Sequence, residues 1–489
     1  MSKKAAVIGA GVGGMAAAIR LALKGYDTHL FETNSEPGGK IGELHLNGCR
    51  FDTGPSLFTL PELVDELFTL AGENPRDHFR YVSLPSSCRY FYDDGTLLNA
   101  WTDRERFASE AERVTGEPRE KVLAFLDECA ELYDLTAPIF IFSPFYQLEN
   151  FRKPESINVA RNFRKLNAFS TMHGVIRKRF TSAKMIQLFD RYATYNGSSP
   201  YRAPGTLNVI AHLEHNMGAY FPEKGMRAII DALAGLARRS GVTFHTGVKV
   251  LSVVRDGKRI TGIETSGGSV TAQVVVSDVD VIPFYRDLLK EEGMARRQER
   301  QERSTSALIF YWVMKRRFEQ LDLHNIFFSS DYPAEFKSLR RGGVSSDPTV
   351  YLFASSRVVV TDAPADRDNW FVMINVPYDR GQDWDRVISR ARADIINKVS
   401  KRLGIDIGDL IEAERILDPL LIERMTGSNR GALYGSSSNG RFAAFRRHPN
   451  VKGRYENLWF TGGTVHPGGG IPLCLASARI ACDMIPPAD

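Results

Sequence analysis

The residues best suited to chemistry are glycines close to the N-terminus. Gly9, Gly11 and Gly14 stand in G-x-G-x-x-G spacing, and Glu32 follows 18 positions beyond Gly14. The first glycine permits a tight turn, the second lets a pyrophosphate approach the backbone, and the third lets a helix pack closely on a strand. A carboxylate at position 32 can accept hydrogen bonds from a ribose with a free 2′-hydroxyl. This pattern predicts a dinucleotide site.

A second glycine pair favours FAD over a nicotinamide dinucleotide. Gly38 and Gly39 precede the basic Lys40 soon after the predicted ribose-binding acid, and "RFDTGP" follows at residues 50–55. More backbone is therefore expected against the same cofactor, although "PGGK" by itself would be an ordinary surface turn. An acid followed by Gly-Gly-Lys resembles the FAD-dependent amine oxidase and carotenoid desaturase superfamily.

A third cluster, "HPGGGIP" at residues 466–472, precedes the last predicted helix. Pro472 falls in its first turn, where a missing N–H is harmless. A helix N-terminus carries a partial positive charge. Directed at the N1–C2=O edge of a flavin, it would stabilise the reduced ring and favour hydride acceptance at N5. The glycines remove Cβ atoms that would collide with a flat ring.

An α/β fold is needed to bring these motifs together. Strand patterns cover residues 5–8, 27–32 and 458–460, and an alanine-rich helix ends at Gly25. Elsewhere the glycine motifs give way to aromatic and charged residues. We therefore expect a Rossmann-type FAD-binding domain interleaved with a substrate domain of mixed sheet and helices. The expected FAD-binding segments are 1–90, 216–294 and 426–489. The expected substrate segments are 91–215 and 295–425.

Composition excludes several classes of protein. At 489 residues, 43% of them hydrophobic, the chain exceeds one ordinary globular core. A net charge of +5, spread along the chain, argues against a nucleic-acid partner. Five scattered cysteines suggest a reduced, cytoplasmic setting and no metal. His212 and His215 lack a third ligand and are expected on a solvated helix face. No transmembrane helix is expected.

Over most of its length the chain resembles bacterial carotenoid desaturases of the phytoene desaturase type. The resemblance is carried by "AVIGAGVGGMAAAIRLALKG", "CRFDTGPSLF", "YFPEKGMRAIIDAL", "GVTFHTGVKVLSV", "VVVSDVDVIPFYRDLL" and the terminal G-x-x-x-H-P-G-x-G-I-P signature. It implies that Val250 offers backbone groups to the adenine and that Ser277 and Asp278 border the nucleotide. The expected cofactor-binding residues are Gly9, Gly11, Val12, Gly13, Gly14, Glu32, Thr33, Gly38, Gly39, Lys40, Gly54, Pro55, Ser56, Val250, Ser277, Asp278, Gly463, Gly470, Ile471 and Pro472.

Two residues indicate a branch of that family. Related chains more often have H-P-G-A-G-I-P-G, whereas Gly469 and Leu473 stand here. This form resembles the branch that inserts a C3–C4 double bond into 1-hydroxylated acyclic carotenoid ends, as in 1′-hydroxy-γ-carotene. Glycine in place of alanine at 469 is expected to open room for about one methyl group beside the polyene. The runner-up is a phytoene desaturase producing neurosporene or lycopene.

The implied reaction moves a hydride from an allylic C–H to flavin N5, with a proton lost from the neighbouring carbon. A delocalised cation makes that proton acidic, so a weak base suffices, and the proton acceptor stays unassigned. His466 is a candidate catalyst, or it holds the glycine loop. The electron acceptor is expected to be oxygen or a quinone.

Two other classes compete. A flavin oxidase of amines or porphyrinogens is opposed by the carotenoid-type C-terminus. A flavin-free prenyl-binding protein, resembling the Rab GDP-dissociation inhibitors, is opposed by the N-terminal fingerprint with Glu32.

A hydrophobic carotenoid substrate must be collected from a bilayer, and one segment could touch it. "LTAPIFIFSPFYQL" (135–148) is followed by a basic series that runs to Lys184. The segment 135–148 carries four aromatic residues, Phe140, Phe142, Phe145 and Tyr146. The segment is either core followed by a solvated helix, or aromatics in the acyl boundary with basic residues against anionic headgroups. We expect the second, and hence peripheral association with the inner face of the cell membrane.

Overall fold

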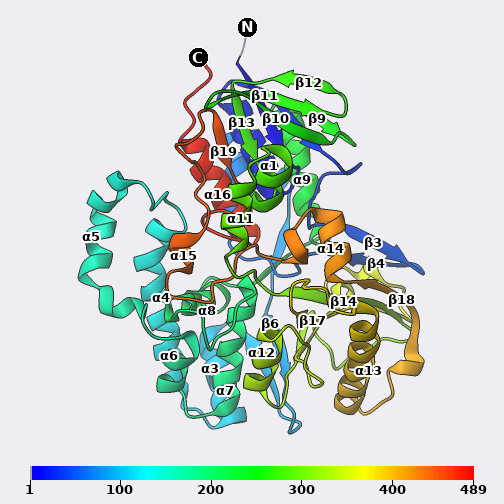
Figure 1. Ribbon diagram of the computed structural model, residues 1–489. Helices are drawn as coiled ribbons and strands as arrows, with labels where there is room; N and C mark the ends of the chain where they lie inside the picture. The colour runs from blue at the N-terminus through cyan, green and yellow to red at the C-terminus, as the bar shows by residue number, and fades with distance from the viewer. Residues whose placement is uncertain (1–2) are drawn as a thin grey trace.

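A five-stranded parallel sheet brings the glycine motifs together (Figure 1). The computed structural model describes residues 3–489, and the strand order in this sheet is β19-β13-β1-β2-β9. The strands are β1 (Lys4–Ile8), β2 (Asp27–Glu32), β9 (Thr243–Thr246), β13 (Val274–Ser277) and β19 (Leu458–Phe460). All neighbouring pairs are parallel. The central strands are apolar runs because both faces of the sheet are covered.

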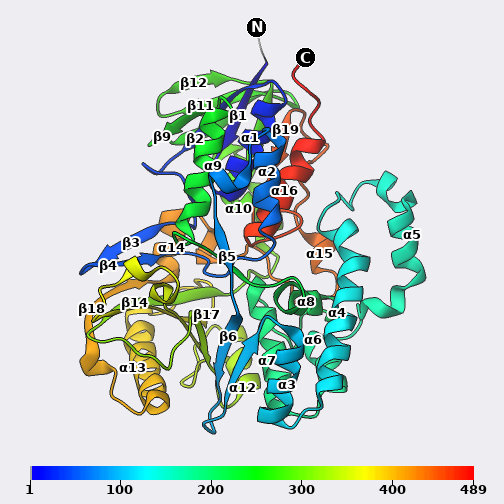
Figure 2. The ribbon, with the colours of Figure 1, turned by 180° about the vertical axis from the view of Figure 1, so that it is seen from behind.

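Helices cover one face of this sheet and a small antiparallel sheet covers the other (Figures 1 and 2). The helices are α1 (Val12–Leu23), α2 (Glu62–Leu70), α9 (Arg227–Arg239) and α16 (Ile471–Asp483). The small sheet comprises β10 (Val250–Asp256), β11 (Arg259–Thr265) and β12 (Gly268–Thr271), with α10 (Val281–Pro283) and α11 (Glu292–Glu299) nearby. Val7 packs with the helices, whereas Ala6 and Ile8 pack toward β10–β12. This alternation along β1 is the period of a strand.

A seven-stranded mixed sheet forms the base of the second part, in the order β18-β14-β17-β16-β15-β6-β7. Its strands are β6 (Ser86–Phe91), β7 (Leu97–Trp101), β14 (Ser306–Met314), β15 (His324–Phe327), β16 (Val350–Phe353), β17 (Asp368–Val376) and β18 (Ile411–Leu417). Helix α13 (Trp384–Leu403) packs on one face. The first domain boundary expected from the sequence, after residue 90, falls inside strand β6. The division of the chain into two domains at that position is therefore a proposal.

Helices complete the second part (Figure 2). One group packs around a shared apolar core: α3 (Arg104–Thr115), α4 (Arg119–Phe140), α6 (Met172–Arg179), α7 (Ala183–Asp190) and α8 (Val209–His215). Helix α12 (Tyr332–Arg340) packs on the same core, and the remaining helices are α5 (Pro154–Arg161), α14 (Pro419–Thr426) and α15 (Ala443–Arg446). The expected α/β class, with a mixed substrate sheet, is confirmed. Within residues 3–489, no helix combines the length and apolarity required to cross a bilayer.

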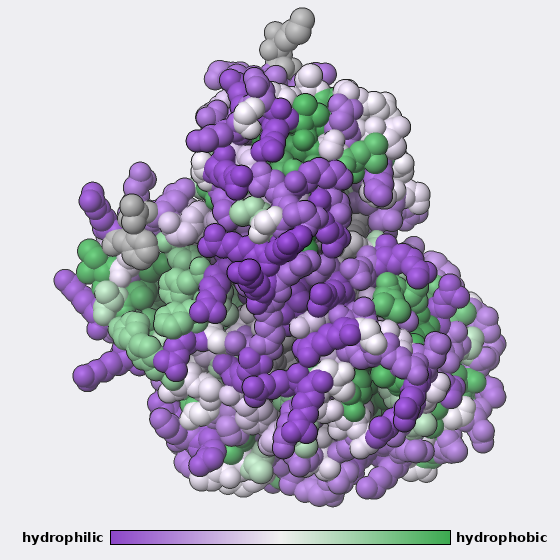
Figure 3. Space-filling view, in the orientation of Figure 1, coloured by the Kyte–Doolittle hydropathy of each residue, from purple (hydrophilic) through white to green (hydrophobic). Residues whose placement is uncertain are grey.

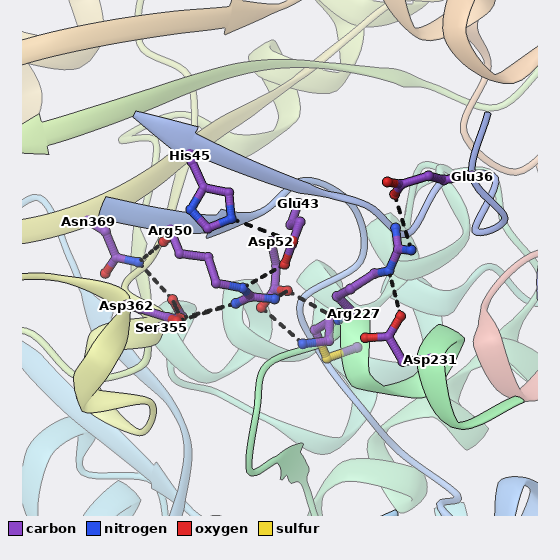
Figure 4. Close-up of polar contacts among 11 residues, drawn as sticks. Glu36, Glu43, His45, Arg50, Asp52, Arg227, Asp231, Ser355, Asp362 and Asn369 are labelled. Atoms are coloured by element: carbon purple, nitrogen blue, oxygen red, sulfur yellow. Dashed lines mark hydrogen bonds and ion pairs between the residues drawn. The ribbon is translucent and has the colours of Figure 1, made fainter. Parts of the chain in front are cut away.

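An ion cluster fixes the loop after β4 (Cys49–Asp52), which pairs with β3 (Glu43–Leu46) (Figure 4). The buried Asp52 carboxylate accepts N–H groups of Met226 (3.0 Å) and Arg227 (3.2 Å), at the start of α9. Arg50 donates to Asp52 at 2.8 Å and pairs with Asp362 at 3.3 Å. Asp52 therefore satisfies helix N–H groups that have no partner within the helix. The cluster ties the "RFDTGP" loop to α9 and to the turn that holds Asp362 between β16 and β17.

Candidate cofactor and substrate site

The turn between β1 and α1 has the features of a phosphate cradle. Gly9 has a φ of 96°, and Gly11 is the N-cap of α1. Within residues 3–489 no side chain caps this helix, and its first turn carries no acidic residue. A Cβ at Gly14 would lie 1.9 Å from the carbonyl oxygen of Gly9, so only glycine fits there. The first N–H groups of α1 are thus available to an anion.

Glu32, at the end of β2, lies directly against this turn. Its side chain is buried, and its two carboxylate oxygens accept the N–H groups of Ala10 (2.9 Å) and Asn34 (2.9 Å). The backbone N–H of Val248, two residues before Val250, donates to the Glu32 carbonyl at 2.9 Å. The structure therefore brings Glu32, Thr33 and the Val250 segment together. Glu32 also holds the glycine turn, a role the sequence pattern does not reveal.

Asp278, which follows Ser277 at the end of β13, lies behind the turn. A Cβ at Gly11 would meet a carboxyl oxygen of Asp278 at 2.5 Å, and one at Gly462 would meet the other at 1.9 Å. These glycines therefore make room for this carboxyl group as well as for an approaching phosphate. Burial, with a smaller contribution from Glu32, raises the pKa of Asp278 to about 7. Partial neutralisation of this carboxyl reduces its repulsion of an anionic ligand.

The second glycine motif lies on the first. Gly38 donates its N–H to the Ala10 carbonyl at 2.9 Å, and a Cβ at Gly39 would be 3.3 Å from Gly11 Cα. A Cβ at Gly54 would be 1.9 Å from the Lys40 carbonyl oxygen, so the loop bearing Pro55 and Ser56 packs here too. The buried Lys40 amine, its pKa lowered by desolvation, donates to the Leu433 carbonyl at 2.6 Å.

The terminal glycines lead into α16, which packs beside α1 (Figures 1 and 2). Gly470 is the N-cap with a φ of 121°, and within residues 3–489 no atom lies within 4 Å of a Cβ built there. Gly462, adjacent to Gly463, lies 3.0 Å from a Cβ built at Gly13. Pro472 occupies the first turn, as expected. The uncapped N-termini of α1 and α16 therefore both lie among the glycine motifs, an arrangement that suits a dinucleotide carrying a flat ring.

His466 is held in a structural network. It is 3% exposed, and its Nε2 donates to the Ser143 carbonyl at 2.8 Å. Burial lowers its pKa to about 4, so the ring is neutral and its Nε2 proton is committed. This geometry favours the loop-holding role over the catalytic one.

Asn450, which sequence reasoning missed, is the centre of that network. Its buried amide nitrogen donates to the carbonyls of Phe460 (3.1 Å) and His466 (2.9 Å) and to Ser477 Oγ (2.9 Å). The Asn450 N–H also donates to the Tyr146 hydroxyl at 3.1 Å. This one residue therefore joins β19, the glycine loop, α16 and the aromatic segment. No local pattern marks an asparagine for this role.

Two expectations about single residues are wrong. A Cβ at Gly469 would point at the Tyr434 ring, 2.9 Å from Cδ1, so the room for a methyl group is filled by this tyrosine and not open to a polyene. His215 is 1% exposed, and its Nε2 shares a hydrogen bond of 2.8 Å with the Tyr192 hydroxyl. It therefore lies in the core and not on a solvated helix face, because α8 packs against α4. Within residues 3–489, no cluster of metal ligands is found.

Residues 12–485 match the family described as flavin containing amine oxidoreductase, and the chain belongs to this family. It is an FAD-dependent oxidoreductase, and its relatives include carotenoid desaturases. The chain is 43% identical over 485 residues to a 1-hydroxycarotenoid 3,4-desaturase of Flavobacterium sp. (strain P99-3), covering 99% of both chains. It is 29% identical to a phytoene desaturase of Fusarium fujikuroi, covering 99% of this chain and 89% of the relative. The fold is also that of putrescine oxidase bound to putrescine (TM-score 0.63, 12% identity, 99% of each chain).

Proposed function

We propose that this enzyme introduces a C3–C4 double bond into the 1-hydroxylated end of an acyclic carotenoid such as 1′-hydroxy-γ-carotene. The observation that carries the proposal is the 43% identity, over 99% of both chains, to a 1-hydroxycarotenoid 3,4-desaturase. The identity to a phytoene desaturase is 29%. The Gly469 and Leu473 variant of the terminal motif supports the same branch.

The residues of the glycine motifs and their neighbours have distinct proposed roles. Gly9–Gly14 and Glu32 hold the pyrophosphate and ribose of FAD, with Thr33, Val250, Ser277 and Asp278 beside them. Gly38–Lys40, Gly54–Ser56, Gly463 and Gly470–Pro472 border the flavin ring. When bound, FAD supplies the hydride acceptor. The chain contributes the uncapped N-terminus of α16 near the ring, and an apolar enclosure that positions the polyene and excludes water.

A competition assay tests the substrate. Purified enzyme is given phytoene and 1′-hydroxy-γ-carotene together, and the products are separated by chromatography. We expect faster conversion of the hydroxylated compound, with one new double bond at the hydroxylated end. Efficient conversion of phytoene to neurosporene or lycopene, with the hydroxylated compound untouched, would establish the runner-up instead.

We also propose peripheral association with the inner face of the cell membrane. The aromatic residues expected in the acyl boundary are not the exposed ones, because Phe145 is buried and Phe140, Phe142 and Tyr146 are half-buried. Five exposed apolar residues define an apolar patch instead: Ile157, Phe163, Phe169, Phe442 and Phe445. Phe163 and Phe169 lie 5.6 Å apart between ring centroids, Arg441 lies over Phe169, and Phe445 packs on Phe145. Figure 3 shows hydrophobic surface around α5 with hydrophilic tips beside it. A hollow of about 260 Å³, lined by Phe169, Arg441 and neighbouring loop residues, borders the patch at Phe169.

The patch makes the membrane proposal testable. The double change Phe169→Ser and Phe442→Ser removes two rings that are 67% and 54% exposed. We expect sedimentation with lipid vesicles to fall about tenfold or more, since burying one such ring in lipid contributes roughly 1.5–3 kcal/mol. Val360→Ser is the matched control, because Val360 is 71% exposed and lies outside the patch. Unchanged sedimentation of the double variant, or an equal loss in the control, contradicts the proposal.

The electron acceptor is predicted to be oxygen or a quinone.

A further inference from the structure

A hollow opens where the apolar patch meets basic side chains. Its wall is formed by residues 168–171, by Arg202 and Pro204, and by residues 439–441. Its volume is about 260 Å³. One water molecule needs only about 10–15 Å³ of such space, so the hollow admits a group of several heavy atoms. The side chains of the wall decide which kind of group fits.

The free charge of the hollow belongs to Arg441. This exposed guanidinium lies 5.7 Å from the centroid of the Phe169 ring, and among the residues that the structure describes no carboxylate pairs with it. Arg202 differs, because it donates to both oxygens of Glu302 at 2.7 Å and its charge is balanced. The Ser170 hydroxyl adds a neutral donor, and no side chain of the described wall is acidic. The hollow therefore suits a group that carries negative charge and accepts hydrogen bonds.

The surface around the hollow is also basic. Residues 150–184 contain nine basic residues against one acidic residue, Glu155. Three of the nine form ion pairs with other elements, and among the residues that the structure describes the other six form none: Arg152, Lys153, Arg161, Arg164, Arg177 and Lys178. Figure 3 shows hydrophilic tips beside the hydrophobic surface of this region. Exposed apolar side chains among unpaired cations are typical of a surface that binds an anionic bilayer.

A phospholipid satisfies the hollow and the patch together. Phe163 and Phe169, beside the hollow, are 43% and 67% exposed. A small soluble anion such as inorganic phosphate leaves these rings in water, whereas the acyl chains of a lipid cover them. An arginine can bind a phosphate through two parallel N–H groups. A choline headgroup adds a cation that Arg441 repels, but a glycerol headgroup adds only hydroxyls, which can bond to Ser170. The contacts therefore favour a lipid with net negative charge, such as phosphatidylglycerol.

We propose that this hollow binds the headgroup of an anionic phospholipid, with the phosphate on Arg441 and the acyl chains across Phe163 and Phe169. The inference rests on the proposed membrane association and adds to it a lipid class and a binding site. A lipid held there fixes how the apolar patch is oriented on the bilayer. A hydrophobic substrate that leaves the bilayer then meets the enzyme from one defined side.

The test measures sedimentation of the holoenzyme with two kinds of vesicle, phosphatidylcholine alone and phosphatidylcholine partly replaced by phosphatidylglycerol. We expect the wild type to prefer the anionic vesicles. Arg441→Lys keeps the charge but loses the pair of parallel donors, so this preference should fall about tenfold, the effect of a lost charge-assisted hydrogen bond. Arg164→Lys is the matched control, because Arg164 is exposed and lies outside the hollow. It should keep the wild-type preference.

A second variant tests the hollow without altering charge. Ser170→Leu narrows the space that the headgroup needs, and we expect the same loss of preference. Unchanged binding of either variant to phosphatidylcholine vesicles shows that the patch is intact and the protein folded. A wild-type preference in both Arg441→Lys and Ser170→Leu, or an equal loss in Arg164→Lys, overturns the proposed site.

Calorimetric titration of the wild-type holoenzyme separates the lipid from a free anion. The probes are dihexanoyl phosphatidylglycerol, below its micelle concentration, and inorganic phosphate. We expect the short-chain lipid to bind more tightly, and equal affinities overturn the proposal. A wild-type enzyme that sediments with neither kind of vesicle contradicts the proposed membrane association. One that binds both kinds equally contradicts this inference alone, so the two failures are distinct.

Discussion

Replacement of Gly14 by alanine is expected to abolish flavin binding and to leave little folded protein. The new Cβ would lie 1.9 Å from the carbonyl oxygen of Gly9 and 3.2 Å from Asp278 Cβ. The first neighbour is backbone of the turn itself, so no side-chain rotation can relieve the clash. Opening the turn costs more than about 3 kcal/mol, a large part of the roughly 5–15 kcal/mol that stabilises a typical protein. The flavin-to-protein absorbance ratio and the thermal unfolding midpoint measure both effects.

The matched control is Gly293→Ala in the first turn of α11. Within residues 3–489 no atom lies within 4 Å of a Cβ built at Gly293, and its φ is not positive. We expect flavin content equal to that of the wild type and unchanged or slightly higher stability, because alanine favours a helix over glycine. A Gly14→Ala protein with full flavin content and the wild-type midpoint would show that the turn is not as tight as described.

The change Glu32→Ala is expected to weaken FAD binding tenfold or more and to lower the free energy of unfolding by about 1–3 kcal/mol. The first effect is the loss of a charged acceptor for the ribose, and the second is the loss of the partner of the buried Ala10 N–H. Titration of the apoprotein with FAD, followed by flavin fluorescence, measures the affinity. Denaturant unfolding of the apoprotein measures the second effect without the cofactor.

Two further variants sharpen this result. Glu32→Gln keeps one acceptor oxygen, so its losses should be intermediate. Glu36→Ala removes a carboxylate whose side chain is 72% exposed, and both quantities should stay at wild-type values. Glu32→Ala protein that retains FAD through dialysis as well as the wild type would remove Glu32 from the cofactor site.

The amino-acid sequence by itself determined the elements whose information is local. The strand, turn, helix and strand from Lys4 to Glu32, and the passage from β19 into α16, follow from residue types that restrict the backbone. Glycine permits positive φ, proline suits a first helical turn, and apolar runs form buried strands. These preferences act over a few residues. Sequence therefore predicted the FAD-binding motif and the α/β class.

Contacts between distant residues were decided by the tertiary structure alone. Asp278 reaches the glycines at positions 11 and 462, and Tyr434 fills the space beside Gly469. Asp52 satisfies the first N–H groups of α9, 174 positions away. Asn450 and His215 have no sequence signal, because asparagine and histidine occur equally well on surfaces. Their roles arise only when packing removes water and leaves each polar group with the partners that the fold places beside it.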